Sequence, residues 1–134
     1  MLTTVNIRSK VKTEFIDITD EVQKIIRESG VKTGVCHLYV PHTTAAVTIN
    51  EGADPSVKRD ILATLNRVIP FDGDYHHVEG NSAAHIRACL VGTSHTFIIE
   101  NGQILLGTWQ GIYLAEFDGP RERRVHVSCQ RAAE

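Results

Sequence analysis

Short runs in which apolar and polar residues alternate, as they do in β-strands, follow one another along most of the chain. Turn residues separate these runs. The clearest pair is residues 96–100 and 103–107, because Asn101-Gly102 between them is the strongest short-range signal for a hairpin. Residues 34–40 place Cys36, Leu38 and Val40 on one face and His37 and Tyr39 on the other. Further strands are expected at residues 3–10, 14–18, 45–50, 111–117 and 123–130. About eight short strands favour two packed antiparallel sheets over one flat sheet.

Helix signals interrupt this β pattern at three places. Thr19-Asp20-Glu21 predicts a helix start with a hydroxyl cap, and Gly30 suits the position after the helix end. Asp54-Pro55 predicts a second start, with Asp54 as the cap, and Ile69-Pro70 ends that helix. A polar loop at 71–81 precedes a short helix that Asn81 can cap. The expected apolar stripes are Val22, Ile25 and Ile26, then Val57, Ile61, Leu65 and Val68, then Ala84, Ile86 and Leu90.

The predicted fold class is therefore α+β, a mainly antiparallel, sandwich-like core of about eight strands with two or three helices. A chain of 134 residues with 42% hydrophobic and 22% charged residues has the composition of one soluble domain, spanning residues 1–134. Its formal net charge of −2 provides no overall electrostatic attraction to nucleic acid or to a membrane surface. Neither is therefore expected as a partner.

The N-terminal residues, the apolar runs and the cysteines predict a cytoplasmic protein. The first residues, Met1-Leu2-Thr3-Thr4, lack the pattern of a signal peptide, and no apolar run approaches the roughly 18 residues of a membrane span. Cys36, Cys89 and Cys129 are odd in number and far apart, which argues against a disulfide framework and a zinc knuckle. Buried free thiols in a reducing compartment are the better interpretation.

The chain contains 7 histidines, and His42 lies in the first of four polar clusters, Pro41-His42-Thr43-Thr44. Histidine is a metal ligand or a base, and the hydroxyls of Thr43 and Thr44 suit phosphate oxygens. The tetrapeptide alone favours a turn whose hydroxyls bond to their own backbone.

The second cluster contains Glu51, and glutamate is unusual at a strand end. Three roles are open for Glu51: a general base, a group that orients a histidine, or an acid at a helix entry.

The third cluster is Tyr75-His76-His77-Val78-Glu79-Gly80-Asn81, followed by His85. Paired histidines with a carboxylate match the ligand chemistry of zinc, although an exposed polar loop explains them equally well. The fourth cluster runs from Gly107-Thr108-Trp109-Gln110-Gly111 to Arg121 and Arg123-Arg124. Trp109 can stack on a flat ring or fill the core, and the arginines can fork to phosphate or remain solvated.

Together these clusters resemble the YjbQ family, also described as secondary thiamine-phosphate synthases. The similar segments are VPHTTAAVTINEGADPSV, YHHVEGNSAAHI and GQILLGTWQGIYLAEFDGPRERRV, and the resemblance runs through essentially the whole chain. It implies a β-rich α+β fold that assembles as a homotrimer. It also implies a histidine-lined metal site built from His42, His77 and His85, with His76 as the alternative to His77.

The resemblance further implies a reaction that joins a pyrimidine methyl diphosphate to a thiazole phosphate and releases diphosphate. A divalent metal, zinc or magnesium, and arginines would neutralise the diphosphate, and an aromatic face would position the pyrimidine. We assign Glu51 and His42 as catalytic residues. The expected substrate-binding residues are Thr43, Thr44, Trp109, Gln110, Arg121 and Arg123. A protein that only binds a metal or a phosphorylated metabolite, and a metal-dependent hydrolase with Glu51 as base, remain as alternatives.

Overall fold

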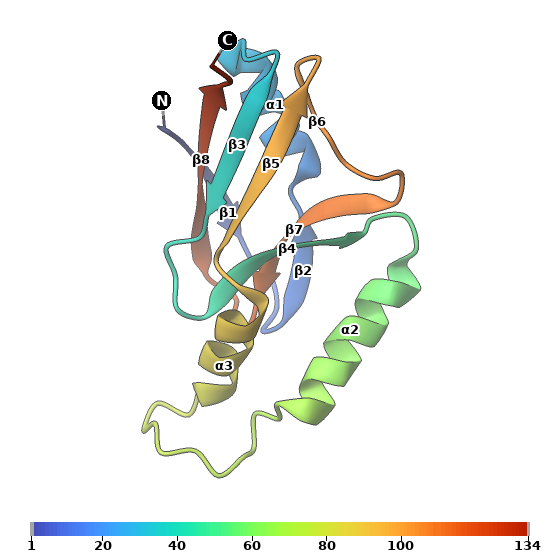
Figure 1. The fold of residues 1–134 in the computed structure, drawn as a ribbon. Coiled ribbons are helices and arrows are strands. Elements are labelled where there is room, and N and C mark those ends of the chain that lie inside the picture. The colour runs from blue at the N-terminus through green and yellow to red at the C-terminus, as the bar shows by residue number, and fades with distance from the viewer. Residues whose placement is uncertain (1, 134) are drawn as a thin grey trace.

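The computed structural model describes residues 2–133 as eight strands and three helices (Figure 1). The strands are β1 (Leu2–Arg8), β2 (Glu14–Asp17), β3 (Gly34–Tyr39), β4 (Ala45–Glu51), β5 (Ser94–Glu100), β6 (Gln103–Ile104), β7 (Gln110–Glu116) and β8 (Glu122–Arg131). The helices are α1 (Thr19–Ser29), α2 (Pro55–Val68) and α3 (Ser82–Val91). All strand pairs are antiparallel, in one sheet ordered β1-β8-β3-β5-β6 and another ordered β2-β7-β4. The predicted α+β fold with two sheets is confirmed.

The main core lies between the inner face of the five-stranded sheet, the three-stranded sheet and α1. Ile26 of α1, Leu38 of β3 and Leu114 of β7 belong to one buried cluster. The predicted faces of β3 are confirmed, since Leu38 is 1% exposed whereas Tyr39 is 52% exposed. Burial of this apolar surface is the main stabilising contribution to the fold.

The predicted hairpin at Asn101-Gly102 is present between β5 and β6. Asn101 has φ 54° and Gly102 has φ 74°, so both turn residues have the positive φ that a type I′ turn requires. The second strand of the hairpin is shorter than the predicted 103–107, because β6 contains only Gln103 and Ile104.

Two predicted helix caps, Asp54 and Gly30, are confirmed, whereas neither Thr19 nor Asn81 caps a helix with its side chain. The Asp54 carboxylate accepts the Ser56 N–H at 2.9 Å at the start of α2, and Gly30 ends α1 with φ 73°. The predicted hydroxyl cap of α1 is wrong, because the Thr19 hydroxyl oxygen accepts the Ile112 N–H from β7 at 2.9 Å. The Asp17 carboxylate instead accepts the Thr19 N–H.

Helices α2 and α3 cover the three-stranded sheet and the end of the molecule beyond it (Figure 1). In α2 no residue is buried, and Val68 of the predicted stripe is 65% exposed. In α3 the buried side contains Ala83, Ala84, Arg87 and Ala88, so Ile86 and Leu90 face outward. Among residues 2–133 no helix is long and apolar enough to cross a membrane.

Candidate functional site

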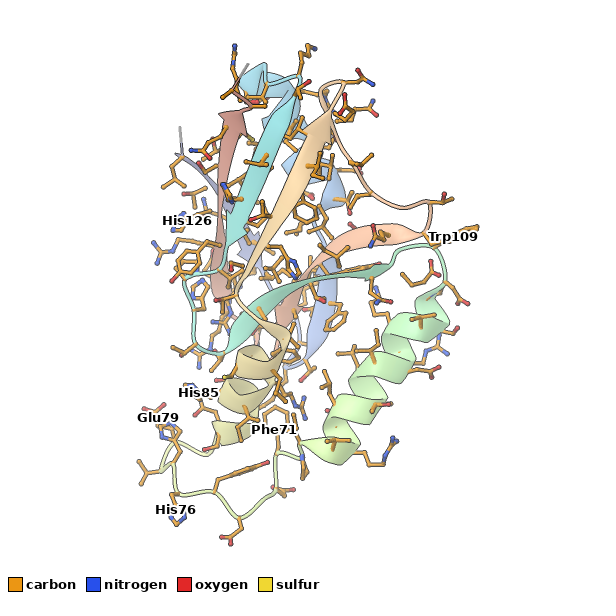
Figure 2. All side chains as sticks on the ribbon, viewed as in Figure 1. Phe71, His76, Glu79, His85, Trp109 and His126 are labelled. Atoms are coloured by element: carbon orange, nitrogen blue, oxygen red, sulfur yellow. The ribbon has the colours of Figure 1, made fainter. Side chains whose placement is uncertain are left out.

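The loop after α2 and the first turn of α3 enclose an open hollow of about 400 Å³, which we call the histidine hollow. It is lined by Asp74, Tyr75, His76, His77, Ser82, His85 and Ile86. The rings of His77 and His85 meet edge to face with centroids 5.4 Å apart, and His77 Nε2 lies 3.7 Å from Glu79 Oε2. His76 lies at the outer end of the loop (Figure 2), so His77 is the histidine whose ring contacts His85.

His42 lies apart from this pair, in the turn between β3 and β4. Its Nε2 accepts the backbone N–H of Arg124 at 2.9 Å, which leaves the ring proton on Nδ1. Burial, followed by the nearby Arg123 and Arg124, lowers the pKa of His42 and favours this neutral form. Within residues 2–133 no three His, Cys, Asp or Glu side chains are grouped to hold a metal ion. The predicted convergence of His42, His77 and His85 is thus not formed in this arrangement of one chain.

A buried ion pair lies behind the His42 turn. Arg123 Nε donates to Glu116 Oε1 at 2.8 Å, and Arg123 Nη2 donates to Thr44 Oγ1 at 2.8 Å. Arg123 is 4% exposed, Thr44 is 6% exposed and Glu116 is fully buried. Thr44 and Arg123 were predicted to bind substrate, but in this structure of one chain both side chains are buried and neither is open to an anion. Both instead connect the turn to β7 and β8.

The same buried network continues to the start of α3. Asp118 Oδ2 accepts Asn81 Nδ2 at 2.9 Å and Arg121 Nη2 at 3.1 Å. The side chain of Asn81 was expected to cap α3, but it instead bonds to Asp118 in the segment that follows β7. Its Oδ1 is buried and has no hydrogen-bond partner within residues 2–133. The side chain of Arg121 remains 54% exposed and can still meet a ligand.

Hydrogen bonds set the charge of both carboxylates in this network. Burial raises the pKa of Glu116, but hydrogen bonds from Arg123, Ser9 and the Asp118 N–H outweigh it, so the pKa lies below its ordinary value. Burial likewise raises the pKa of Asp118, and hydrogen bonds from Asn81 and Arg121 outweigh it. Both carboxylates are therefore ionised at neutral pH.

Arg87, which the sequence analysis did not single out, links α3 to the loop that carries His77. Its Nε and Nη2 donate to the Ile69 carbonyl at 3.2 and 2.7 Å, and its guanidinium lies 4.5 Å from the centre of the Phe71 ring. Arg87 is fully buried, and its Nη1 has no partner within residues 2–133. The available sequence signal was an arginine on the same helix face as Ala83 and Ala84.

Glu51 and Trp109 share a second hollow of about 400 Å³, which we call the tryptophan hollow and which Ala53, Asp54 and Pro55 complete. Glu51 Oε2 accepts the Ala53 N–H at 2.9 Å, and Trp109 is 66% exposed. Gln110 Oε1 accepts the Gly107 N–H at 2.8 Å and so braces its own turn.

Glu51, which the sequence offers as a group that could orient a histidine, lies far from His42. Strands β3 and β4 belong to different sheets, and Glu51 is the last residue of β4. Seven residues at 3.2–3.4 Å each separate the two ends of β4 by about 20 Å. Glu51 is therefore not placed to orient His42 in one chain.

The family model described as UPF0047 protein YjbQ-like matches residues 3–132. The chain belongs to the YjbQ family. A UPF0047 protein of Methanocaldococcus jannaschii is 54% identical over 127 residues, covering 95% of this chain and 92% of that protein. The UPF0047 protein YugU of Bacillus subtilis is 48% identical over 128 residues, covering 95% of this chain and 97% of YugU.

Solved structures of YjbQ-family proteins have the same fold. A Clostridium acetobutylicum protein of the YjbQ/UPF0047 family matches with a TM-score of 0.94 and 55% identity, over 96% of this chain and 99% of that one. A YjbQ-like protein from Sulfolobus solfataricus matches with a TM-score of 0.94 at 32% identity, over 98% and 97% of the two chains. The YjbQ-family segments of this chain supply two separate hollows and a buried network that reaches the start of α3.

Proposed function

We propose that the chain is a metal-assisted transferase that joins a pyrimidine methyl diphosphate to a thiazole phosphate, forming thiamine phosphate and releasing diphosphate. The observation that supports this most directly is the His77–His85 pair, whose ring centroids lie 5.4 Å apart at an open hollow. Two imidazoles at one hollow offer nitrogen ligands to a divalent ion. The choice of reaction rests on the resemblance to secondary thiamine-phosphate synthases.

The donors at the histidine hollow suit zinc better than magnesium, because magnesium prefers oxygen ligands. His77 and His85 supply nitrogens, and the Glu79 carboxylate lies beside His77. We assign His42 as the third ligand, which requires its Nε2 to leave the Arg124 N–H. When bound, the ion would neutralise charge on the departing diphosphate.

The exposed cations near the His42 turn suit the diphosphate itself. A protein of net charge −2 must hold such an anion with local donors. Arg121 and Arg124 are exposed, and so is the Thr43 hydroxyl. A guanidinium can donate two parallel hydrogen bonds to phosphate oxygens. In this proposal Thr44 and Arg123 act indirectly, by fixing the turn that presents Thr43.

The tryptophan hollow suits the pyrimidine. The exposed face of Trp109 can stack on a flat ring, Gln110 lies beside it, and Glu51 can accept a proton as general base. This hollow adjoins the first residues of α2, whereas the histidine hollow follows the last (Figure 2). The 14 residues of α2 span about 21 Å, so one chain keeps the two hollows apart.

We therefore propose a homotrimer in which neighbouring copies bring a histidine hollow and a tryptophan hollow together. The edge strands support assembly, since β1 and β6 end one sheet and β2 and β4 end the other. Uncovered strand edges favour pairing or cover by another chain. The free thiols of Cys36, Cys89 and Cys129 fit the reducing cytoplasm, which is our proposed location.

The test is to measure metal content and product formation together, with both thiamine precursors present. We expect bound zinc and thiamine phosphate, and we expect His85→Ala to lose both while remaining folded. The control is His95→Ala, since His95 on β5 lies outside both hollows. Metal bound without turnover would identify a binding protein. Diphosphate release that needs no thiazole phosphate would identify a hydrolase.

A further inference from the structure

Cys36 and Cys129 lie directly opposite each other on the paired strands β3 and β8. Opposite residues of antiparallel strands have Cα atoms about 4.5–5.5 Å apart, which lies inside the range of about 4.4–6.8 Å found for disulfides. The two side chains point to the same, inner face of the sheet, where both pack against the main core. A bond between these sulfurs therefore needs no rearrangement of the strands.

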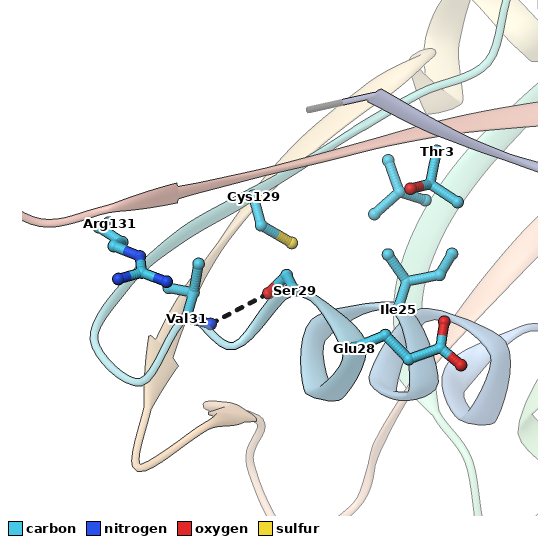
Figure 3. Close-up of a pocket in the computed structure, with 8 residues that line it drawn as sticks. Thr3, Ile25, Glu28, Ser29, Val31, Cys129 and Arg131 are labelled. Atoms are coloured by element: carbon cyan, nitrogen blue, oxygen red, sulfur yellow. Dashed lines mark hydrogen bonds between the residues drawn. The ribbon is translucent and has the colours of Figure 1, made fainter.

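The two thiols differ in access to solvent. Cys36 is fully buried, and burial together with the neighbouring Cys129 raises its pKa to about 12. Cys129 is half-buried and lines a hollow of about 280 Å³ between α1 and the end of β8 (Figure 3). The hollow is also lined by Glu28, Ser29 and Arg131. A small oxidant in solution thus reaches Cys129 first.

We propose that Cys36 and Cys129 form a peroxide-reactive pair that closes a reversible cross-strand disulfide. In the first step the Cys129 thiolate attacks hydrogen peroxide. An S–O bond forms, the O–O bond breaks, and the leaving hydroxide takes up a proton to become water, so Cys129 becomes a sulfenic acid.

In the second step the Cys36 sulfur attacks the Cys129 sulfur. The S–S bond forms and the S–O bond breaks, and the hydroxide leaves as water with the proton of Cys36. Two thiols lose two electrons in total, and one peroxide is reduced to two waters. The position of the two residues directly opposite each other before reaction compensates for the low thiolate content of Cys36. Such reversible disulfides are the kind found in reducing compartments.

The experiment treats the full-length protein with hydrogen peroxide, blocks the remaining thiols with N-ethylmaleimide and maps the peptides by mass spectrometry. We expect one linked peptide pair containing Cys36 and Cys129, one blocked thiol at Cys89, and reversal by dithiothreitol. We also expect a higher Tm for the oxidised protein, because the bond closes a loop of about 90 residues in the unfolded chain. Cys89 is the internal control, because it is exposed on α3.

Three variants make the proposal falsifiable. Cys89→Ser should form the linked pair at the same rate as the natural chain. Cys36→Ala should accumulate a sulfenic acid at Cys129 that dimedone captures, and Cys129→Ala should slow oxidation of Cys36 about tenfold or more. The proposal is wrong if peroxide oxidises Cys89 while Cys36 and Cys129 both remain blockable. It is also wrong if the only disulfides formed join Cys89 between molecules.

Discussion

Arg123 and Glu116 form an ion pair in which both side chains are almost completely buried. Replacing Arg123 by Met leaves the Glu116 carboxylate without its main partner, and breaking a buried pair in this way costs about 3–5 kcal/mol. We expect Arg123→Met to lower the free energy of unfolding by that amount, measured by urea denaturation. Arg124→Met is the matched control on the same strand, because its side chain is exposed and the change should stay within about 0.5 kcal/mol. Equal losses in the two variants would contradict the assigned role of the pair.

Glu51 provides a second prediction at the scale of one residue. The change Glu51→Gln keeps an acceptor for the Ala53 N–H but removes the negative charge. If Glu51 is the general base, turnover should fall by roughly 10²–10⁴-fold. The free energy of unfolding should fall by no more than about 1 kcal/mol, the contribution of an acid near a helix start. Steady-state kinetics and denaturation of the same preparation separate the two effects, and full activity would exclude the catalytic role.

At the scale of elements, Arg87 connects α3 to the loop between α2 and α3. The change Arg87→Met removes both hydrogen bonds to the Ile69 carbonyl and leaves this acceptor unpaired, which costs about 1–3 kcal/mol. We expect faster amide hydrogen exchange in residues 71–81 and weaker zinc binding, since this loop carries His77. Arg87→Lys, which keeps a charged donor, should recover part of both properties. Arg67→Met is the control on exposed α2, and exchange no faster than in this control would contradict the prediction.

At the scale of the whole molecule, ionised buried groups make stability depend on pH. The folded-state pKa values of Glu116 and Asp118 lie below their ordinary values of 4.5 and 3.8. Their contribution to the free energy of unfolding is therefore fully present at pH values above these ordinary values. It is lost as pH falls through the folded-state values. The lowered pKa of His42 adds a loss that begins below its ordinary value of 6.5, because the unfolded chain then binds the extra proton. Urea denaturation at fixed protein concentration should show stability constant near pH 7 and falling through these two windows, and a flat profile to pH 3 would contradict it.

The proposed assembly is tested in solution. Sedimentation at micromolar concentration should show one species with three times the 14.9 kDa mass of the chain. Since each complete site would combine hollows from two copies, dilution that dissociates the trimer should lower activity in parallel. A species of monomer mass would rule out the trimer, and a dissociated chain with full activity would rule out the shared site.

The sequence by itself determined the features that depend on residues close together along the chain. Alternating residues in β3, the positive φ at Asn101-Gly102 and the Asp54 cap were predictable because their physical causes lie within a few residues. The contact between His77 and His85 was also within reach, since one loop and the first turn of α3 carry both.

Only the tertiary structure decided which distant polar groups meet. Thr44 meets Arg123 and Asn81 meets Asp118 across 79 and 37 residues. Local patterns carry no information on such pairs, because a buried polar group accepts any suitable partner that the fold brings near. The sheet to which each strand belongs is likewise a choice between pairings of similar local energy. That choice placed β3 and β4 in different sheets. The separation of Glu51 from His42 follows from the length of β4, because Glu51 ends the seven-residue strand that follows the His42 turn.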